Sequence, residues 1–265
     1  MADDAELIKA GTQGLVEGFL KPYHDLILSI FGPAADELGL MLKDGVKEFR
    51  RRRTLRFFGR TSERVQIARI EPRAVPLKIL LPILENASIE ENDDLQDVWA
   101  SLLANAADPR PDSLKVLPSF PNILKELTSA DVKFLDVLYR RSSELSPRPK
   151  SGDLESVTYE LEDLFATYSQ TGLANRSYYI RPSAEDLSLH LDEVRGDKQS
   201  IQVILDSLIR QRLISSMIAP PEITMGYTQP PLKVTYSLTH LGVMFVKACQ
   251  PPSQDEEKEL EPPLQ

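Results

Sequence analysis

The sequence predicts a mainly α-helical protein: an N-terminal helical region, then a C-terminal winged helix-turn-helix-like α+β domain with a small two-stranded wing. Three observations support this prediction. Apolar residues recur at helical spacing along most of the chain. Two short strand-like segments near the C-terminus flank a proline-rich stretch that is typical of a turn. A final helical pattern follows the second strand.

The composition is typical of a soluble globular protein. The chain has 265 residues, of which 42% are hydrophobic and 27% are charged. Its single cysteine, Cys249, excludes an internal disulfide and favours a cytoplasmic location. The acidic N-terminus lacks the pattern of a signal peptide, and no stretch reaches the roughly 18 apolar residues of a membrane-spanning helix. We therefore expect a cytoplasmic protein, with peripheral membrane contact through the N-terminal helices as an alternative.

The N-terminal helical region is predicted to cover residues 1–71. A helical pattern over 5–31 is interrupted at Pro22, and a second helix is expected to begin near Pro33. The apolar stripe of this second helix is predicted to be Leu38, Leu42, Val46 and Phe49.

The segment FRRRRTLRFFGR, at 49–60, is strongly basic in a chain whose formal net charge is −9. Residues 47–73 hold ten Lys or Arg and three Asp or Glu, a net of +7, which leaves the rest of the chain at −16. On a helix that continues through Gly59, four arginines fall within an arc of about 80°. This arginine column consists of Arg53, Arg56, Arg60 and Arg64, and it lies opposite Leu55, Phe58 and Val65.

The arginine column is interpreted as a docking face for an anionic partner, either nucleic acid or an anionic membrane surface. Three alternatives stay open: pairing with the chain's own acidic turns at 90–97, a solvated face, and contact with another subunit. Phe57 is expected to be an exposed aromatic side chain beside the column. One such ring is too few for the base stacking that single-stranded nucleic acid requires.

A central helical block is predicted over residues 72–120, and it divides near 86–88. Ser88 and Glu91 have the spacing of a capping box, which predicts that Ser88 caps the second helix of the block. The acidic residues that follow favour the positive end of the helix dipole. The buried stripe is predicted to be Leu95, Val98, Trp99, Leu102 and Leu103.

The winged-helix-like domain is predicted over residues 121–250. Its first helix is expected to follow Thr128 or Ser129 as N-cap and to end near Ser143. An acidic insert at about 145–195 contains two weaker helical patterns, at 153–169 and 183–194.

The second half of this domain carries the wing. A helix at the recognition position, Lys198–Arg212, is expected to bury Ile201, Ile204, Leu205 and Leu208. It runs into a short strand, a second strand covers 233–238, and a last helix ends at Cys249. The tail, 251–265, is acidic and contains prolines, and we expect it to be disordered.

The recognition helix offers five polar side chains to a ligand: Lys198, Gln199, Gln202, Arg210 and Arg212. Residues 183–250 nevertheless contain six Lys or Arg and seven Asp or Glu. Because phosphate contacts supply much of the affinity for DNA, this charge favours recognition of a protein over recognition of DNA.

The sequence contains no nucleophile motif and no glycine-rich phosphate loop. Its histidines lie in separate segments: His24, His190 and His240. The pairs Glu90–Asp94 and Asp93–Asp97 have i,i+4 spacing, but they lack a histidine and suit helix capping better than metal binding. We expect no catalytic residues, no metal, no cofactor and no small-molecule substrate, and hence no enzyme.

The string Leu-x-x-x-Trp-Ala-x-Leu-Leu-Ala-Asn, from Leu95 to Asn105, resembles the abortive infection alpha (Abi-alpha) family of bacterial proteins. The PLKILLPILENASIEEND block before it and the later segments LTSADVKFLDVL and YSLTHLGVMF are similar to that family as well. The likeness covers roughly residues 30–250. It implies a role in phage resistance through abortive infection, and it brings with it no established reaction and no catalytic motif.

We therefore expect a non-catalytic antiviral protein that acts through a protein partner or through self-association. The alternatives are a winged-helix DNA-binding transcriptional regulator and a peripheral-membrane effector that uses the N-terminal helices.

Overall fold

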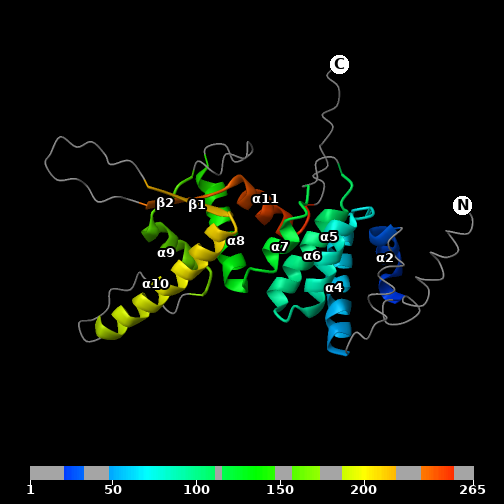
Figure 1. Cartoon of the computed structure of the whole chain (residues 1–265), viewed down its shortest axis with the longest axis horizontal. Coiled ribbons are helices and arrows are strands. Elements are labelled where there is room, and N and C mark those ends of the chain that lie inside the picture. Colours follow the sequence, from blue (N-terminus) through cyan, green and yellow to red (C-terminus); the bar gives the residue numbers. More distant parts are fainter. Residues whose placement is uncertain are drawn as a thin grey trace, which may run out of the picture. The chain divides into compact units, whose positions relative to one another are not determined.

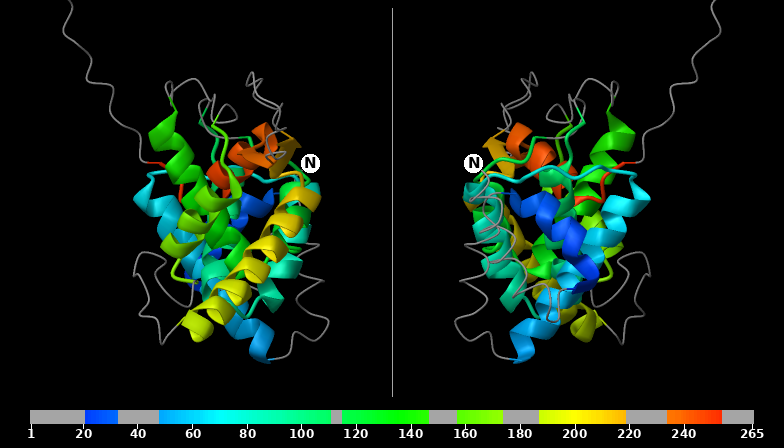
Figure 2. Two further views of the ribbon diagram at one scale, coloured as in Figure 1. Left: turned by 90° about the vertical axis from the view of Figure 1, so that its left-hand side faces the viewer. Right: turned by 90° about the vertical axis from the view of Figure 1, so that its right-hand side faces the viewer.

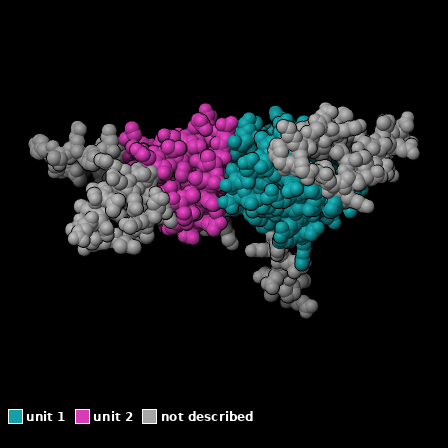
Figure 3. Space-filling view, turned by 90° about the horizontal axis from the view of Figure 1, so that it is seen from below, with its two compact units in different colours: residues 1–125, 248–265 teal, residues 126–247 magenta. Residues whose placement is uncertain are grey.

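A computed structural model describes residues 21–32, 48–110, 115–146, 157–173, 187–218 and 234–253. Within these residues the protein is mainly α-helical with a small two-stranded antiparallel sheet, which confirms the predicted fold class (Figure 1). The chain divides into two compact units (Figure 3). Unit 1 comprises Met1–Lys125 and Ala248–Gln265, and unit 2 comprises Glu126–Lys247.

The described part of unit 1 contains η1 Lys21–Tyr23, α2 His24–Phe31, α4 Glu48–Ile67, α5 Leu77–Ile89, α6 Asp93–Ala107 and α7 Phe120–Leu124. In this unit, α5 and α6 pack on the long helix α4, and α7 packs on α5. The Phe31 ring of α2 also lies on α4, with its centroid 6.4 Å from that of Phe58.

The α4 helix continues through Gly59 without a break, as the predicted arginine column requires. A Cβ atom at this position would lie 2.8 Å from the Tyr23 hydroxyl oxygen, so the glycine lets η1 pack closely on the helix. Phe58 and Val65 are buried as expected, but Phe57 is only 1% exposed, so the prediction of an exposed ring is wrong. Because neighbours lie on more than one side of α4, its apolar surface is wider than a single stripe.

The turn between α5 and α6 differs from the prediction. The α5 helix runs to Ile89, and Ser88 is still helical, donating its hydroxyl hydrogen to the Glu85 carbonyl oxygen. The N-cap of α6 is Asn92, whose Oδ1 accepts a hydrogen bond from the Leu95 amide at 3.1 Å.

A side chain of α6 explains why α5 extends so far. The Nε2 atom of Gln96 donates to the Ala87 carbonyl at 3.2 Å and to the Glu90 carbonyl at 3.0 Å. These carbonyls at the end of α5 have no partner further along the helix. Four members of the predicted α6 stripe are buried, Leu95, Trp99, Leu102 and Leu103, while Val98 is half-buried.

The described part of unit 2 contains α8 Ser129–Leu145, α9 Leu161–Gln170, α10 Leu187–Arg210, β1 Ile214–Ile218 and β2 Val234–Leu238. It also contains α11 His240–Cys249 except for its last two residues, which belong to unit 1. The two strands are antiparallel, and their register runs from Ile214 opposite Leu238 to Ile218 opposite Val234. Tyr159 forms a bridge to Tyr236 through two backbone hydrogen bonds of 2.8 Å. This order of elements is compatible with a winged helix.

Two helices of unit 2 test the sequence predictions directly. Of the two predicted N-cap candidates for α8, the structure has Thr128, which also forms a capping box with Asp131. The α10 helix, drawn in yellow in Figure 2, is one continuous element, whereas the sequence suggested a weak helix at 183–194 and a separate one from Lys198. Its predicted inward side chains are all buried: Ile201, Ile204, Leu205 and Leu208.

Several predictions concern residues outside the described ranges. The N-terminal helix is described only from Lys21, and Pro33, Leu38, Leu42 and Val46 lie outside, as do the loop at 219–233 and most of the acidic tail. Across the residues that are described, no helix combines the length and the apolar character needed to cross a membrane.

Candidate functional site

The arginine column lies along α4 and faces the acidic first turns of α6. Its outer members pair as follows. Arg53 donates from Nη2 to Glu91 Oε1 at 2.8 Å and from Nη1 to the Ile89 carbonyl at 3.2 Å. Arg56 Nη1 lies 3.3 Å from Asp93 Oδ1, and 55% of its side chain is exposed.

The inner members of the column are held more closely. Arg60 donates to Asp93 Oδ1 and to the Asp93 carbonyl, each at 2.9 Å. Arg64 donates from Nη2 to Asp97 Oδ1 at 2.8 Å and from Nε to Ser101 Oγ at 2.9 Å, and only 14% of its side chain is exposed. The same carboxylates that could have formed a metal pair, Asp93 and Asp97, therefore bind guanidinium groups.

These contacts correspond to one of the alternatives drawn from the sequence, in which the arginine column pairs with the chain's own acidic turns at 90–97. Each of the four arginines has a carboxylate of α6 or of the turn before it as a partner. An external anion would have to compete with these carboxylates for the same donors. A docking role for Arg53, Arg56, Arg60 and Arg64 stays a prediction.

The proposed recognition residues lie on α10 and in the turn that follows it. Gln199, Gln202 and Arg210 are exposed, and the Lys198 side chain lies outside the description. Arg212 is exposed in the turn, with a positive φ of 59°, and its carbonyl accepts a hydrogen bond from the Thr239 hydroxyl at 2.6 Å. The structure therefore places Gln199, Gln202 and Arg210 on one face of a helix, at spacings of three and eight residues.

Two further side chains on this face were not selected from the sequence. Val203 is 69% exposed, and Asp206 is exposed one turn further along α10. The signal was present, because Val203 falls outside the stripe of isoleucines and leucines that fill the core, and lies four residues after Gln199.

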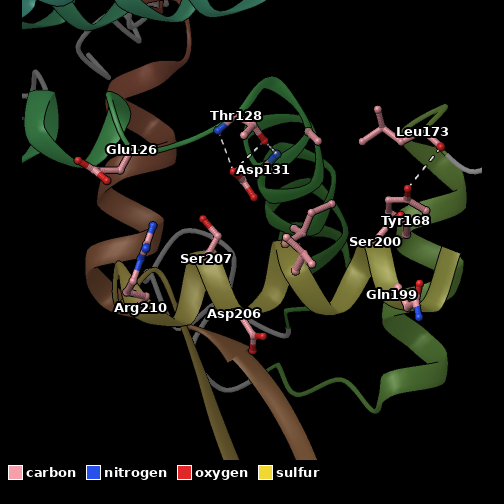
Figure 4. A pocket seen from close by; sticks show the side chains of 13 residues that line it. Glu126, Thr128, Asp131, Tyr168, Leu173, Gln199, Ser200, Asp206, Ser207 and Arg210 are labelled. Atoms are coloured by element: carbon pink, nitrogen blue, oxygen red, sulfur yellow. Dashed lines mark hydrogen bonds between the residues drawn. The ribbon is translucent and has the colours of Figure 1, made fainter. Parts of the chain in front are cut away.

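A groove of about 980 Å³ lies beside this face, within unit 2. Its walls are the N-terminal end of α8, the C-terminal end of α9 and the part of α10 from Gln199 to Arg210 (Figure 4). The charged lining residues are Glu126, Asp131, Asp206 and Arg210. Asp131 is buried, and its Oδ2 accepts hydrogen bonds from the Thr128 amide at 2.7 Å and the Thr128 hydroxyl at 2.8 Å.

Two side chains with raised pKa values, those of Cys249 and Tyr159, are not among the residues that line the groove. Burial raises the pKa of the Cys249 thiol, which keeps the sulfur protonated near neutral pH. Burial also raises the pKa of Tyr159, against a smaller opposing effect from its hydrogen bond of 2.9 Å with Ser142 and from the charge of Arg141. Both effects stabilise the neutral form of a side chain in the interior.

Histidine, cysteine and carboxylate side chains are the usual protein ligands of metal ions. Within the described ranges, no three of these groups lie close enough together to hold a metal ion. Residues 187–198, which include His190, are described only as backbone.

Comparison with known proteins places these features in a family. A search of curated proteins found no match, and neither did a search of solved structures. Residues 50–249 match the family described as abortive infection alpha. The match begins within α4, includes α6 with the Leu95–Asn105 string, and ends with the last residue of α11. Since it covers well over half of the sequence, the chain belongs to the abortive infection alpha family.

Proposed function

We propose that the protein acts in bacterial antiviral defence by abortive infection, as a non-catalytic cytoplasmic component that recognises another protein. Membership of the abortive infection alpha family supports the defence role. Recognition of a protein is supported by one observation, the exposed face of α10, where Val203 is 69% exposed. An exposed valine contributes favourable free energy when a partner removes it from water.

The same face is poorly suited to duplex DNA. Asp206 lies between Val203 and Arg210 on the exposed side of α10. A carboxylate at this position repels the phosphates that supply much of the affinity for DNA. Protein recognition is therefore favoured over a DNA-binding role for the helix.

Phage challenge tests the defence role. Bacteria that express the wild-type chain should show a lower efficiency of plating than bacteria that carry an empty vector. Val203→Lys should remove this protection, because it places a charge on the recognition face. Gln66→Lys adds the same charge at an exposed residue of α4 that is not part of the recognition face, and it should retain protection. Equal plating with wild type and empty vector across a panel of phages would refute the proposal.

The proposed absence of catalysis has its own test. Purified protein is incubated with nucleotides and with nucleic acid, and hydrolysis products are measured by chromatography. We expect no turnover. A hydrolytic activity that copurifies with the chain and is lost on a single substitution would replace the proposal with an enzymatic mechanism.

A DNA-binding regulator is the second candidate, and the order of α8, α9, α10, β1 and β2 is the observation that favours it. A gel shift on duplex DNA at moderate salt separates the two candidates. Binding that weakens with salt and is lost in an Arg210→Ala/Arg212→Ala double variant would support DNA recognition. A wild-type chain that does not shift DNA removes this candidate.

A further inference from the structure

The groove along α10 has the length of a short helical segment. Its lining residues on α10 run from Gln199 to Arg210. At 1.5 Å per residue this part of the helix is about 16 Å long, which corresponds to roughly three turns of a partner helix. Grooves of this kind bind amphipathic helices by burying one apolar side chain per turn.

The apolar lining offers an anchor point. Ile204 is buried at the base of the groove, and Val203, on the same turn of α10, remains exposed. Leu173 lies in the turn that follows α9, on the opposite wall of the groove, and its side chain is half-exposed. A partner side chain that lies between Val203 and Leu173 would remove both from water.

The charged residues that line the groove favour one sign of charge on the partner. Three carboxyl groups, those of Glu126, Asp131 and Asp206, line the groove together with one guanidinium group, that of Arg210. Figure 4 shows Arg210 on the side of α10 that faces Glu126, at one end of the groove. A cationic partner is attracted by such a lining, and an anionic one is repelled.

We infer that this groove docks a cationic amphipathic helix of a partner protein, with an apolar anchor against Val203 and lysine or arginine side chains beside Glu126 and Asp206. The inference rests on the proposed function, since it specifies where the partner is recognised and what chemistry it presents. In this proposal the partner helix binds in the groove, and the exposed face of α10 forms one wall of the binding site.

Fluorescence anisotropy on the full chain tests the inference with two labelled helical peptides. Both carry leucines at positions i, i+4 and i+7; one has lysines on its polar face, and the other has glutamates. We expect the lysine peptide to bind at least about tenfold more tightly than the glutamate peptide, a difference of roughly 1.4 kcal/mol. Equal binding of the two peptides would overturn the inference.

Matched variants separate docking in the groove from general attraction to an acidic protein. Val203→Lys adds one positive charge to the groove lining and Asp206→Asn removes one negative charge from it, and each should weaken binding of the lysine peptide about tenfold. Gln66→Lys adds the same charge at an exposed residue of α4 that does not line the groove, and it should change the affinity less than about twofold. Equal weakening by all three variants would show that only net charge matters.

Other results would identify a different occupant of the groove, or would show that only one of the two proposals, peptide docking or phage defence, is correct. Self-association of the wild type in sedimentation, abolished by Val203→Lys, would identify the occupant as a second copy and overturn the inference. If Val203→Lys abolishes peptide binding but cells that express it still restrict phage, the inference fails while the defence role stands. If wild type binds the lysine peptide but never restricts phage, the defence role fails instead.

Discussion

Asn105, the last residue of the string that carries the family resemblance, joins two distant parts of the chain. Its Nδ2 donates to the Ala248 carbonyl at 2.9 Å and to the Gln250 carbonyl at 2.8 Å. The last carbonyls of a helix have no partner within it, and a buried carbonyl that remains unpaired is costly. The asparagine therefore has a structural reason to lie at this position, since its amide satisfies the end of α11.

Gly242 makes a second residue-scale contact, and a substitution tests it. A Cβ atom there would overlap the Leu213 carbonyl oxygen, which belongs to the backbone and cannot rotate away. We expect Gly242→Ala to lower the free energy of unfolding by about 1–3 kcal/mol, as overpacking does. Denaturant unfolding followed by far-UV circular dichroism measures this change.

Gly59→Ala is the matched control for this prediction. Its new Cβ would meet the hydroxyl end of Tyr23, a side chain that can move aside. Alanine also gains about 1 kcal/mol of helix propensity over glycine. The net effect should be small. Comparable destabilisation by both substitutions would contradict the assignment of the Leu213 backbone as the obstacle.

At the scale of elements, the arginine column stabilises the packing of α4 on α6, and its members should contribute unequally. Arg64 is mostly buried and binds both Asp97 and Ser101, whereas Arg56 is largely exposed and makes one contact of 3.3 Å. We expect Arg64→Ala to lower the free energy of unfolding by about 1–3 kcal/mol, because it removes a mostly buried side chain and its charged hydrogen bond to Asp97. Arg56→Ala should change it by about 0.5 kcal/mol or less, as is usual for an exposed ion pair.

Chemical denaturation at low and high salt measures both substitutions. The Arg56 effect should disappear at high salt, where exposed charges are screened, and most of the Arg64 effect should persist. Equal effects of the two substitutions, both abolished by salt, would mean that the column is only a solvated face.

The elements of this fold were largely predictable from the sequence, because periodicity and capping act locally. The N-cap of α8 at Thr128 and the buried stripe of α10 follow from residues a few positions apart. The start of α6 does not, since Ser88 and Asn92 are both good capping residues and the choice depends on Gln96 binding the end of α5. Phe57 was misjudged because its burial depends on which helices pack on α4.

The candidate site was predictable only in part, for the same reason. The sequence named α10 and three of its exposed polar residues, and it offered the acidic turns at 90–97 as partners for the arginine column. It did not indicate the groove, because its lining comes from α8, α9 and α10, which are separated in the chain. Val203 could have been found from its position outside the buried stripe of α10, and the structure adds that its side chain is 69% exposed.

At the scale of the whole molecule, the chain begins in unit 1, forms unit 2 and returns to unit 1 at Ala248. The returning residues bind side chains near the end of α6 and just after it. Asn105 binds the carbonyls of Ala248 and Gln250, and both Nη atoms of Arg110 donate to the Ser253 carbonyl at 3.1 Å. No local pattern predicts such contacts, because more than a hundred residues separate the partners in the chain.

Because residues 248–253 bind side chains at and just after the end of α6, we expect truncation of the C-terminus to affect α6. A stop after Lys247 removes the carbonyl partners of Asn105 and Arg110, and we expect unit 1 to lose about 2–4 kcal/mol of stability through unpaired buried groups and lost packing. A stop after Ser253 removes only residues 254–265 and should have little effect. Hydrogen exchange measured by mass spectrometry should show faster exchange across α6 in the first truncation and unchanged exchange in the second. Unchanged protection of α6 after the stop at Lys247 would mean that residues 248–253 do not stabilise unit 1.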